Sequence, residues 1–209
     1  MKAIVFVGLV ATALVGVQCE NQITRTMRKY QVIPDVIFEG PENELDVGYG
    51  DVDVVAPHTL TPTETKDKPD YVNWDADDDA YYTLIFTAPD GPTRANPKFR
   101  EVIKWLVVNI PGTQIDKGHE IVQYIGAAPE KKAGLSRYVY LVYKQKGKQE
   151  FDEKKIDNKS FEPRKHFSTR GFVKKHKLEE KPVAGTFFQS RWDDYVPVLY
   201  KQIGYKPSS

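Results

Sequence analysis

The chain contains 209 residues, with 30 Lys and Arg against 29 Asp and Glu, and a single Cys. This near-zero net charge excludes a long-range attraction to nucleic acid or to an anionic membrane, so we expect no nucleic-acid partner. The single cysteine excludes a disulfide within the chain.

The first residues have the pattern of a secretory signal peptide. Lys2 precedes an apolar run over residues 3–17, and Cys19 precedes the polar Glu20. The run is shorter than the ~20 residues that span a bilayer, so we expect cleavage after Cys19 and no stable membrane insertion. The expected organisation is a signal peptide at 1–19 and a single secreted, extracellular domain at 20–209. The mature chain then has no thiol nucleophile and, without Lys2, no net charge.

The next segments alternate between helical and strand patterns. Ile23, Met27 and Tyr30 have helical spacing, which predicts a short helix or a docked arm over residues 21–31. We expect Pro34 to end that helix. Short β-prone segments at 45–49 and 52–56 flank glycines and predict a hairpin, and residues 69–74 predict a further strand.

Asp75, Asp77 and Asp79 form a D-x-D-x-D pattern that invites comparison with a calcium loop. An EF-hand loop requires Gly at its sixth position and Glu at its twelfth, where this chain has Ala80 and Phe86. We therefore predict a solvated acidic loop between two strands and no metal site.

Three runs rich in β-branched and aromatic residues occupy residues 81–145. They read Y-Y-T-L-I-F-T-A, then V-I-K-W-L-V-V-N-I, then R-Y-V-Y-L-V-Y-K-Q, with Pro and Gly between them. The third is apolar at every position over residues 138–143, which is typical of a strand covered on both faces. We predict three buried strands joined by shaped loops.

The remaining segments predict peripheral structure. Residues 144–170 are charged, with few apolar anchors, and predict a long, mobile surface excursion that carries a glycosylation sequon at Asn158. A short amphipathic helix at 172–178, a strand at 182–189 and a C-terminal helix at 196–203 follow. The fold class is therefore mainly β and mostly antiparallel, with peripheral helices.

Two blocks of the sequence resemble the phosphatidylethanolamine-binding protein family. A-P-D-G-P-T-R at 88–94 is similar to that family's D-P-D-x-P-[ST]-R, and R-E-V-I-K-W-L-V-V-N at 100–109 is similar to its R-E-x-x-x-x-L-V-V-N. The resemblance runs from about residue 32 to 200. It implies a two-sheet fold with one large central sheet and a small anion-binding cavity near one end of that sheet.

The resemblance also places the candidate ligand-binding residues. They are Asp90, Pro92, Lys104, Ala128, Pro129, Ser136, Tyr138 and Phe188. In the family, imidazoles, a Tyr hydroxyl and backbone N–H groups around this cavity bind a phosphate-type anion, and carboxylates orient the imidazoles.

The chain departs from the family pattern at several of these positions. Lys104 and Ser136 replace the two histidines, Ala88 replaces the first aspartate, and Phe188 replaces a tyrosine. The sequence leaves three possibilities open. An Asp90–Lys104 ion pair closes the pocket, Lys104 binds a phosphate in place of histidine, or Ser136 binds a neutral polar ligand.

No catalytic motif accompanies this site. The four histidines lie outside it, and the chain has no P-loop, no H-E-x-x-H and no G-x-G-x-x-G, so we expect neither catalysis nor a cofactor. We expect a monomeric binding protein for a small anionic or polar ligand or a phospholipid headgroup. The alternative is an inhibitor of an extracellular serine protease or another protein-interaction regulator, since members of the family inhibit serine-type peptidases.

Overall fold

A computed structural model describes residues 20–207 of the chain. The predicted signal peptide at 1–19 lies outside these residues. The elements in chain order are α1 (Gln22–Lys29), α2 (Val32–Asp35), β1 (Asn43–Glu44), β2 (Asp46–Tyr49), β3 (Val52–Asp53), β4 (Tyr71–Asn73), β5 (Tyr81–Ala88), β6 (Val102–Pro111), η1 (Ile115–Lys117), β7 (His119–Val122), β8 (Ser136–Lys144), η2 (Glu162–Arg164), α3 (Thr169–Lys175), β9 (Ala184–Ser190) and α4 (Val196–Ile203).

The structure contains a large sheet and a small sheet. The large sheet has six strands in the order β1-β9-β8-β5-β6-β7, and the small sheet has three in the order β3-β2-β4. All strand pairs are antiparallel except β1 with β9. The predicted mainly β, two-sheet fold is confirmed, with the refinement that one edge of the large sheet is parallel.

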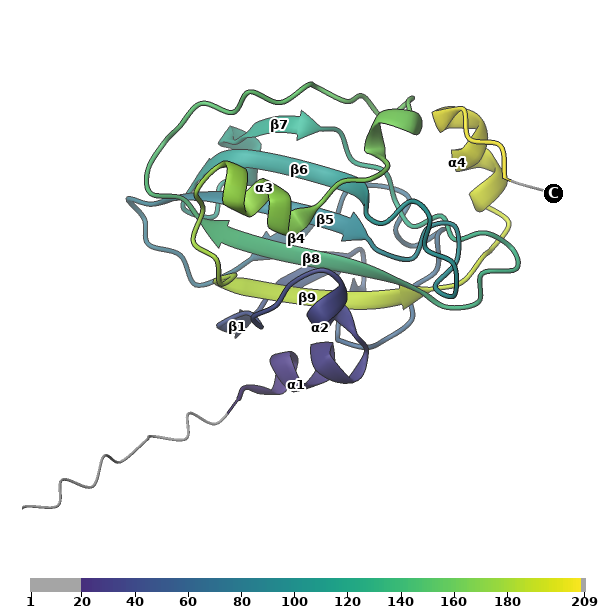
Figure 1. The fold of residues 1–209 in the computed structure, drawn as a ribbon, viewed down its shortest axis with the longest axis horizontal. Helices are drawn as coiled ribbons and strands as arrows, with labels where there is room; N and C mark the ends of the chain where they lie inside the picture. The colour runs from purple at the N-terminus through teal and green to yellow at the C-terminus, as the bar shows by residue number, and fades with distance from the viewer. Residues whose placement is uncertain (1–19, 208–209) are drawn as a thin grey trace, which may run out of the picture.

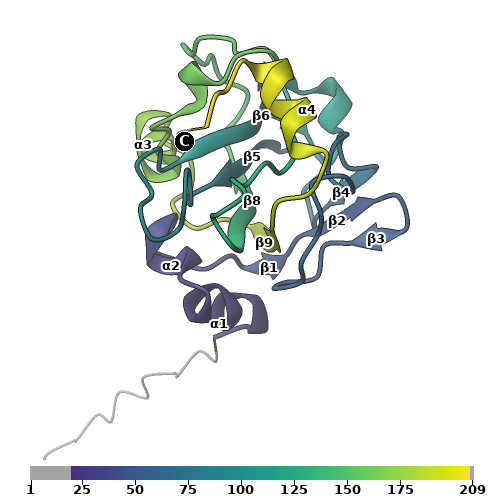
Figure 2. The ribbon, with the colours of Figure 1, turned by 90° about the vertical axis from the view of Figure 1, so that its right-hand side faces the viewer.

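The large sheet is covered on both faces. The small sheet packs on one face, while α1, α2 and α3 cover the other (Figures 1 and 2). This sandwiching explains why β5 and β8 are apolar at almost every position: successive side chains enter two different cores. On β8, for example, Tyr140 and Val142 face the small sheet, whereas Val139 and Leu141 face the helices.

The N-terminal segment forms a helix, as the spacing of its apolar residues predicts. Asn21 caps α1 by accepting a hydrogen bond from the backbone N–H of Thr24. The prediction that Pro34 ends this helix is wrong. The chain leaves the helix at Gln31, whose φ is 60°, and Pro34 lies within the single turn α2. A residue before proline avoids helical angles, and Ile33 is accordingly extended.

The later helices and the hairpin also form. Helix α3 starts three residues before the predicted helix because the Ser168 side chain accepts a hydrogen bond from the backbone N–H of Gly171. Helix α4 matches its prediction and buries Val196, Leu199 and Ile203. The predicted hairpin corresponds to β2 and β3.

Residues 144–170 have little regular structure, but the expectation of few apolar anchors was wrong. Phe151, Ile156 and Phe167 pack against the core on the helix side of the large sheet, and Ile156 pairs with Val122 in an isolated bridge. Arg164 is fully buried and donates hydrogen bonds to the backbone carbonyls of Ser160, Ile103, Lys104, Gln123 and Asp157. The segment is therefore tied to the sheet at several points.

The acidic loop before β5 shows no metal cluster. Asp77 forms an ion pair with Lys144, with 2.5 Å between Oδ2 and Nζ. No group of His, Cys, Asp and Glu within residues 20–207 could hold a metal ion. In the same part of the chain, no helix combines the length and the apolar character needed to cross a bilayer.

Candidate functional site

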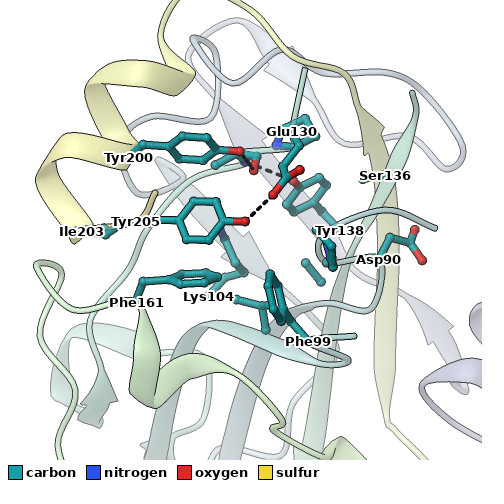
Figure 3. A pocket seen from close by; sticks show the side chains of 16 residues that line it. Asp90, Phe99, Lys104, Glu130, Ser136, Tyr138, Phe161, Tyr200, Ile203 and Tyr205 are labelled. Atoms are coloured by element: carbon teal, nitrogen blue, oxygen red, sulfur yellow. Dashed lines mark hydrogen bonds between the residues drawn. The ribbon is translucent and has the colours of Figure 1, made fainter. Parts of the chain in front are cut away.

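Strands β6 and β8 begin at the same end of the large sheet, next to α4 (Figure 1). A small cavity lies at this end (Figure 3). Its volume is about 50 Å³, and its apolar lining includes Ala88, Phe99, Val102, Phe161 and Ile203. A cavity needs roughly 10–15 Å³ to hold one water molecule, so this cavity holds only a few non-hydrogen atoms.

Most of the predicted ligand-binding residues surround this cavity. The lining includes Asp90, Pro92, Lys104, Ala128, Pro129, Ser136 and Tyr138. Phe188 is not among the lining residues. It is fully buried one layer below, where its ring stacks on Tyr138 with 5.2 Å between the ring centroids. Phe188 therefore supports the cavity wall rather than facing a ligand.

Ser136 and Tyr138 lie two residues apart on β8 and so face the same side of the sheet. The Ser136 hydroxyl is buried and has no hydrogen-bond partner within residues 20–207. The Tyr138 hydroxyl accepts a hydrogen bond from the backbone N–H of Ala128 at 3.0 Å. Burial raises the pKa of Tyr138, so its hydroxyl stays protonated and keeps a hydrogen to donate. The cavity thus presents two hydroxyl groups.

Lys104 reaches the cavity from an irregular position on β6. The register pairs Phe86 with Trp105 and Thr87 with Ile103, so Lys104 is left without a partner in the ladder. Such a β-bulge turns consecutive side chains away from strict alternation. As a result, both Lys104 and Trp105 lie on the side of the sheet that faces the cavity and the small sheet.

The side chain of Lys104 is buried, and no counter-ion reaches it from the described residues. The residue is 4% exposed, and within residues 20–207 its side chain forms no ion pair and no hydrogen bond. Its Nζ lies over the face of Tyr138, 5.8 Å from the ring centroid. Burial, together with the positive charge of Arg164, holds the pKa of Lys104 well below its ordinary value.

Asp90 does not pair with Lys104, so the Asp90–Lys104 ion pair considered from the sequence is wrong. Asp90 accepts hydrogen bonds from Arg137, at 2.8 Å from its backbone N–H, 2.9 Å from Nε and 2.5 Å from Nη2. Arg100 Nη2 lies 3.6 Å from the same carboxylate. Arg137 points to the helix side of the sheet and binds the Asp90 carboxylate, so Asp90 is not a counter-ion of Lys104.

Arg137 also holds the N-terminal segment in place. It donates to the backbone carbonyls of Tyr30 at 3.0 Å and Gln31 at 2.6 Å, and to the carboxylate of Asp35 at 2.7 Å. Together with the bonds to Asp90, these contacts give each of the three guanidinium nitrogens a hydrogen-bond acceptor. The ionic network built on Arg137 is therefore a structural device.

The C-terminal residues form a wall of the cavity that the sequence analysis missed. The hydroxyl of Tyr205 donates to the carboxylate of Glu130, and the hydroxyl of Tyr200 donates to the carbonyl of Ala128 at 3.3 Å (Figure 3). The ring of Tyr205 packs on Phe161 with 4.4 Å between centroids. The sequence signal for this wall was the presence of aromatic residues on and just after α4, namely Tyr200 and Tyr205.

Asn158 lies in a turn and is half-buried. Its backbone N–H donates to Gln123, and its carbonyl accepts from Gln202. Its glycosylation stays a prediction.

The family model described as phosphatidylethanolamine-binding protein matches residues 41–188. A Drosophila melanogaster protein named putative odorant-binding protein A5 is 40% identical over 201 residues, which cover 96% of this chain and 94% of the relative.

Solved structures share the fold. A phosphatidylethanolamine-binding protein from Plasmodium vivax superposes with a TM-score of 0.65 at 17% identity, covering 81% of this chain and 97% of the other. A carboxypeptidase Y inhibitor, solved in complex with its cognate proteinase, superposes with a TM-score of 0.68 at 22% identity, covering 81% and 95%.

Proposed function

Since the chain belongs to the phosphatidylethanolamine-binding protein family, we propose that it is a secreted, non-enzymatic carrier of a small neutral polar molecule. The ligand binds in the cavity lined by Lys104, Ser136 and Tyr138. The domain that carries it spans residues 20–209, after removal of the signal peptide at 1–19.

The unpartnered hydroxyl of Ser136 carries this proposal. A buried hydroxyl without a hydrogen bond costs about 1–3 kcal/mol relative to a satisfied one. A polar ligand in the cavity supplies the missing partner, and the proton of the Tyr138 hydroxyl offers a second hydrogen bond. The apolar side chains around both groups then exclude water from the bound molecule.

The size and charge of the cavity favour a neutral ligand over a phosphorylated headgroup. A volume of about 50 Å³ is too small for phosphoethanolamine. Glu130 lines the same cavity and repels an anion, while the lowered pKa of Lys104 weakens the positive charge that would attract one. The relative named as a putative odorant-binding protein is consistent with a small organic ligand.

Ligand titrations followed by amide NMR test this proposal. We expect ethanol, a neutral probe that fits the cavity, to shift the resonances of Ala128, Ser136 and Tyr138, and phosphoethanolamine to leave them unchanged. Ser136→Ala should weaken ethanol binding by about 0.5–1.5 kcal/mol, the typical net value of one hydrogen bond.

Ser190→Ala is the matched control. Ser190 is also a buried serine whose hydroxyl has no hydrogen-bond partner, but it does not line the cavity. If Ser136→Ala and Ser190→Ala weakened ethanol binding equally, the proposed binding site would be rejected. The absence of NMR shifts near Ala128 with both ethanol and phosphoethanolamine would also reject it.

A second candidate function is inhibition of an extracellular serine protease. The fold similarity to a carboxypeptidase inhibitor supports it, and residues 144–170 and 174–177 offer charged surfaces for contact. A panel of serine endopeptidases and carboxypeptidases, assayed with micromolar protein, tests it. Unchanged protease activity throughout the panel would exclude this function.

A further inference from the structure

The Lys104 amine occupies a position that burial alone does not explain. A buried ammonium normally has a carboxylate or several hydrogen-bond acceptors, because an unpaired charge in a protein interior is costly. Lys104 has neither in the described part of the chain, yet its side chain lines a cavity. The β-bulge at this residue turns the amine into the cavity instead of into the strand ladder.

The carboxylates around the cavity are engaged by other groups and do not pair with the Lys104 amine. Asp90 is bound by Arg137 and approached by Arg100, and Glu130 accepts a hydrogen bond from Tyr205. Arg164, which donates to the carbonyl of Lys104 at 3.2 Å, adds a repelling positive charge.

The hydroxyls add no negative charge. The pKa values of Tyr138, Tyr200 and Tyr205 are all raised, mainly by burial, so these side chains remain neutral. Burial and the positive charge of Arg164 hold the pKa of Lys104 well below its ordinary value, which favours the neutral amine and its lone pair relative to an exposed lysine.

This inference rests on the proposed function and names the ligand class for the same cavity. We propose that Lys104 captures a small aldehyde covalently, as a reversible imine. A desolvated lysine amine is the group that forms such imines with carbonyl compounds.

The reaction needs no other reactant. The amine nitrogen attacks the carbonyl carbon, a C–N bond forms, and the carbonyl electron pair moves to oxygen, which takes a proton from the nitrogen. The carbinolamine then loses its C–O bond, and the oxygen leaves as water with the second amine proton. The products are the imine and one water, and the reverse reaction releases the aldehyde.

The cavity supplies the remaining requirements. The Ser136 hydroxyl has no partner and can donate to the carbonyl oxygen as its negative charge develops. The apolar side chains of Ala88, Val102 and Phe161 fit the hydrocarbon part of the ligand. The volume limits that part to a few carbon atoms, so acetaldehyde is a suitable probe.

Reductive trapping of the whole mature chain tests the inference. The protein is incubated with acetaldehyde at pH 7 and reduced with borohydride, and peptide mass spectrometry locates the added ethyl groups. We expect Lys104 to carry at least about tenfold more label than exposed lysines such as Lys132 and Lys201, whose ammonium groups are hydrated. Lys104→Met, which keeps an unbranched side chain, should lose this label and leave that of Lys132 unchanged.

Several results would overturn the inference. Label spread evenly over exposed lysines and Lys104 contradicts it, and this comparison within the unmodified chain holds even if Lys104→Met does not fold. Ethanol shifts at Ser136 without a Lys104 adduct would reject imine formation while leaving the proposed carrier function intact. Absence of both ethanol shifts and adduct would reject the two together.

Discussion

Two buried basic residues of the large sheet, Arg137 on β8 and Lys104 on β6, have opposite surroundings. Arg137 is fully buried and binds two carboxylates and two backbone carbonyls. Lys104 is 4% exposed and has no ion pair or hydrogen bond within residues 20–207.

Both residues are buried, so burial does not distinguish them. The difference is that Arg137 has hydrogen-bond and ion-pair partners, which makes it structural, whereas Lys104 has none within residues 20–207 and is a candidate functional residue. Arg137 lies between Ser136 and Tyr138 on β8, so strand alternation sends it to the opposite face of the sheet. The guanidinium of Arg137 therefore lies on the face of the sheet opposite the cavity, while Asp90 both lines the cavity and binds Arg137.

We expect the largest loss of folding stability when the ion pair between Arg137 and Asp90 is removed. Arg137→Met keeps much of the side-chain volume but leaves the buried Asp90 carboxylate with the backbone N–H of residue 137 and with Arg100 at 3.6 Å, without its main ion-pair partner. Removing one partner of a buried ion pair costs about 3–5 kcal/mol, which denaturant unfolding will measure.

Arg94→Ala is the control for this variant, because Arg94 donates to the same Tyr30 carbonyl from a less buried position. We expect it to cost no more than about 1.5 kcal/mol. Equal losses for the two variants would show that the contact with the N-terminal segment, and not the Asp90 pair, dominates.

Glu101 is an intermediate case, with hydrogen bonds but no ion pair in the described chain. It accepts from the backbone N–H of Thr169 at 2.8 Å and from the Thr169 hydroxyl at 2.6 Å. Burial raises its pKa from 4.5 to about 7. Between these values the folded state binds more protons than the unfolded state, so this group makes the protein less stable as pH rises.

We therefore expect Glu101→Gln to stabilise the protein at pH 8, by up to about 3 kcal/mol, and to have little effect at pH 4. Thermal unfolding across this pH range measures the difference. A gain of the same size at both pH values would show that the charge of Glu101 is not its cause.

Lys104→Met has the smallest expected effect and the opposite pH dependence. The pKa of Lys104 is lowered, so below the ordinary lysine range the unfolded state binds more protons and stability falls as pH falls. The variant should be more stable than the original at pH 6, and the gain should shrink toward pH 10. A variant that is less stable at pH 6 would indicate a counter-ion for Lys104 and remove the contrast with Arg137.

The sequence alone located most of the elements and seven of the sixteen residues that line the cavity. Patterns of β-branched and aromatic residues located β5, β6, β8 and β9, and the family blocks located seven lining residues at the end of the sheet. Strand β7 was not predicted. Its four residues, beginning with His119 and Glu120, carry too short a pattern to be distinguished from a loop.

The predictions that depended on contacts between distant residues were less successful. The pairing of Asp90 with Lys104 was wrong because residue types do not reveal that Arg137 reaches Asp90 from the other face. Phe188 was predicted to contact the ligand, but it stacks behind Tyr138 instead. This position depends on the register between β8 and β9, which the sequence does not reveal. The wall formed by Tyr205 depends on how α4 packs against the end of the sheet.

The sequence by itself determined the fold class, because strand periodicity and the Pro- and Gly-rich loops are local properties of the chain. It also determined that a lysine and a serine occupy the positions of two family histidines. Only the tertiary structure decided which buried charges are paired. That outcome depends on distances of a few ångströms between strands, and on a bulge in β6 that directs Lys104 into the cavity.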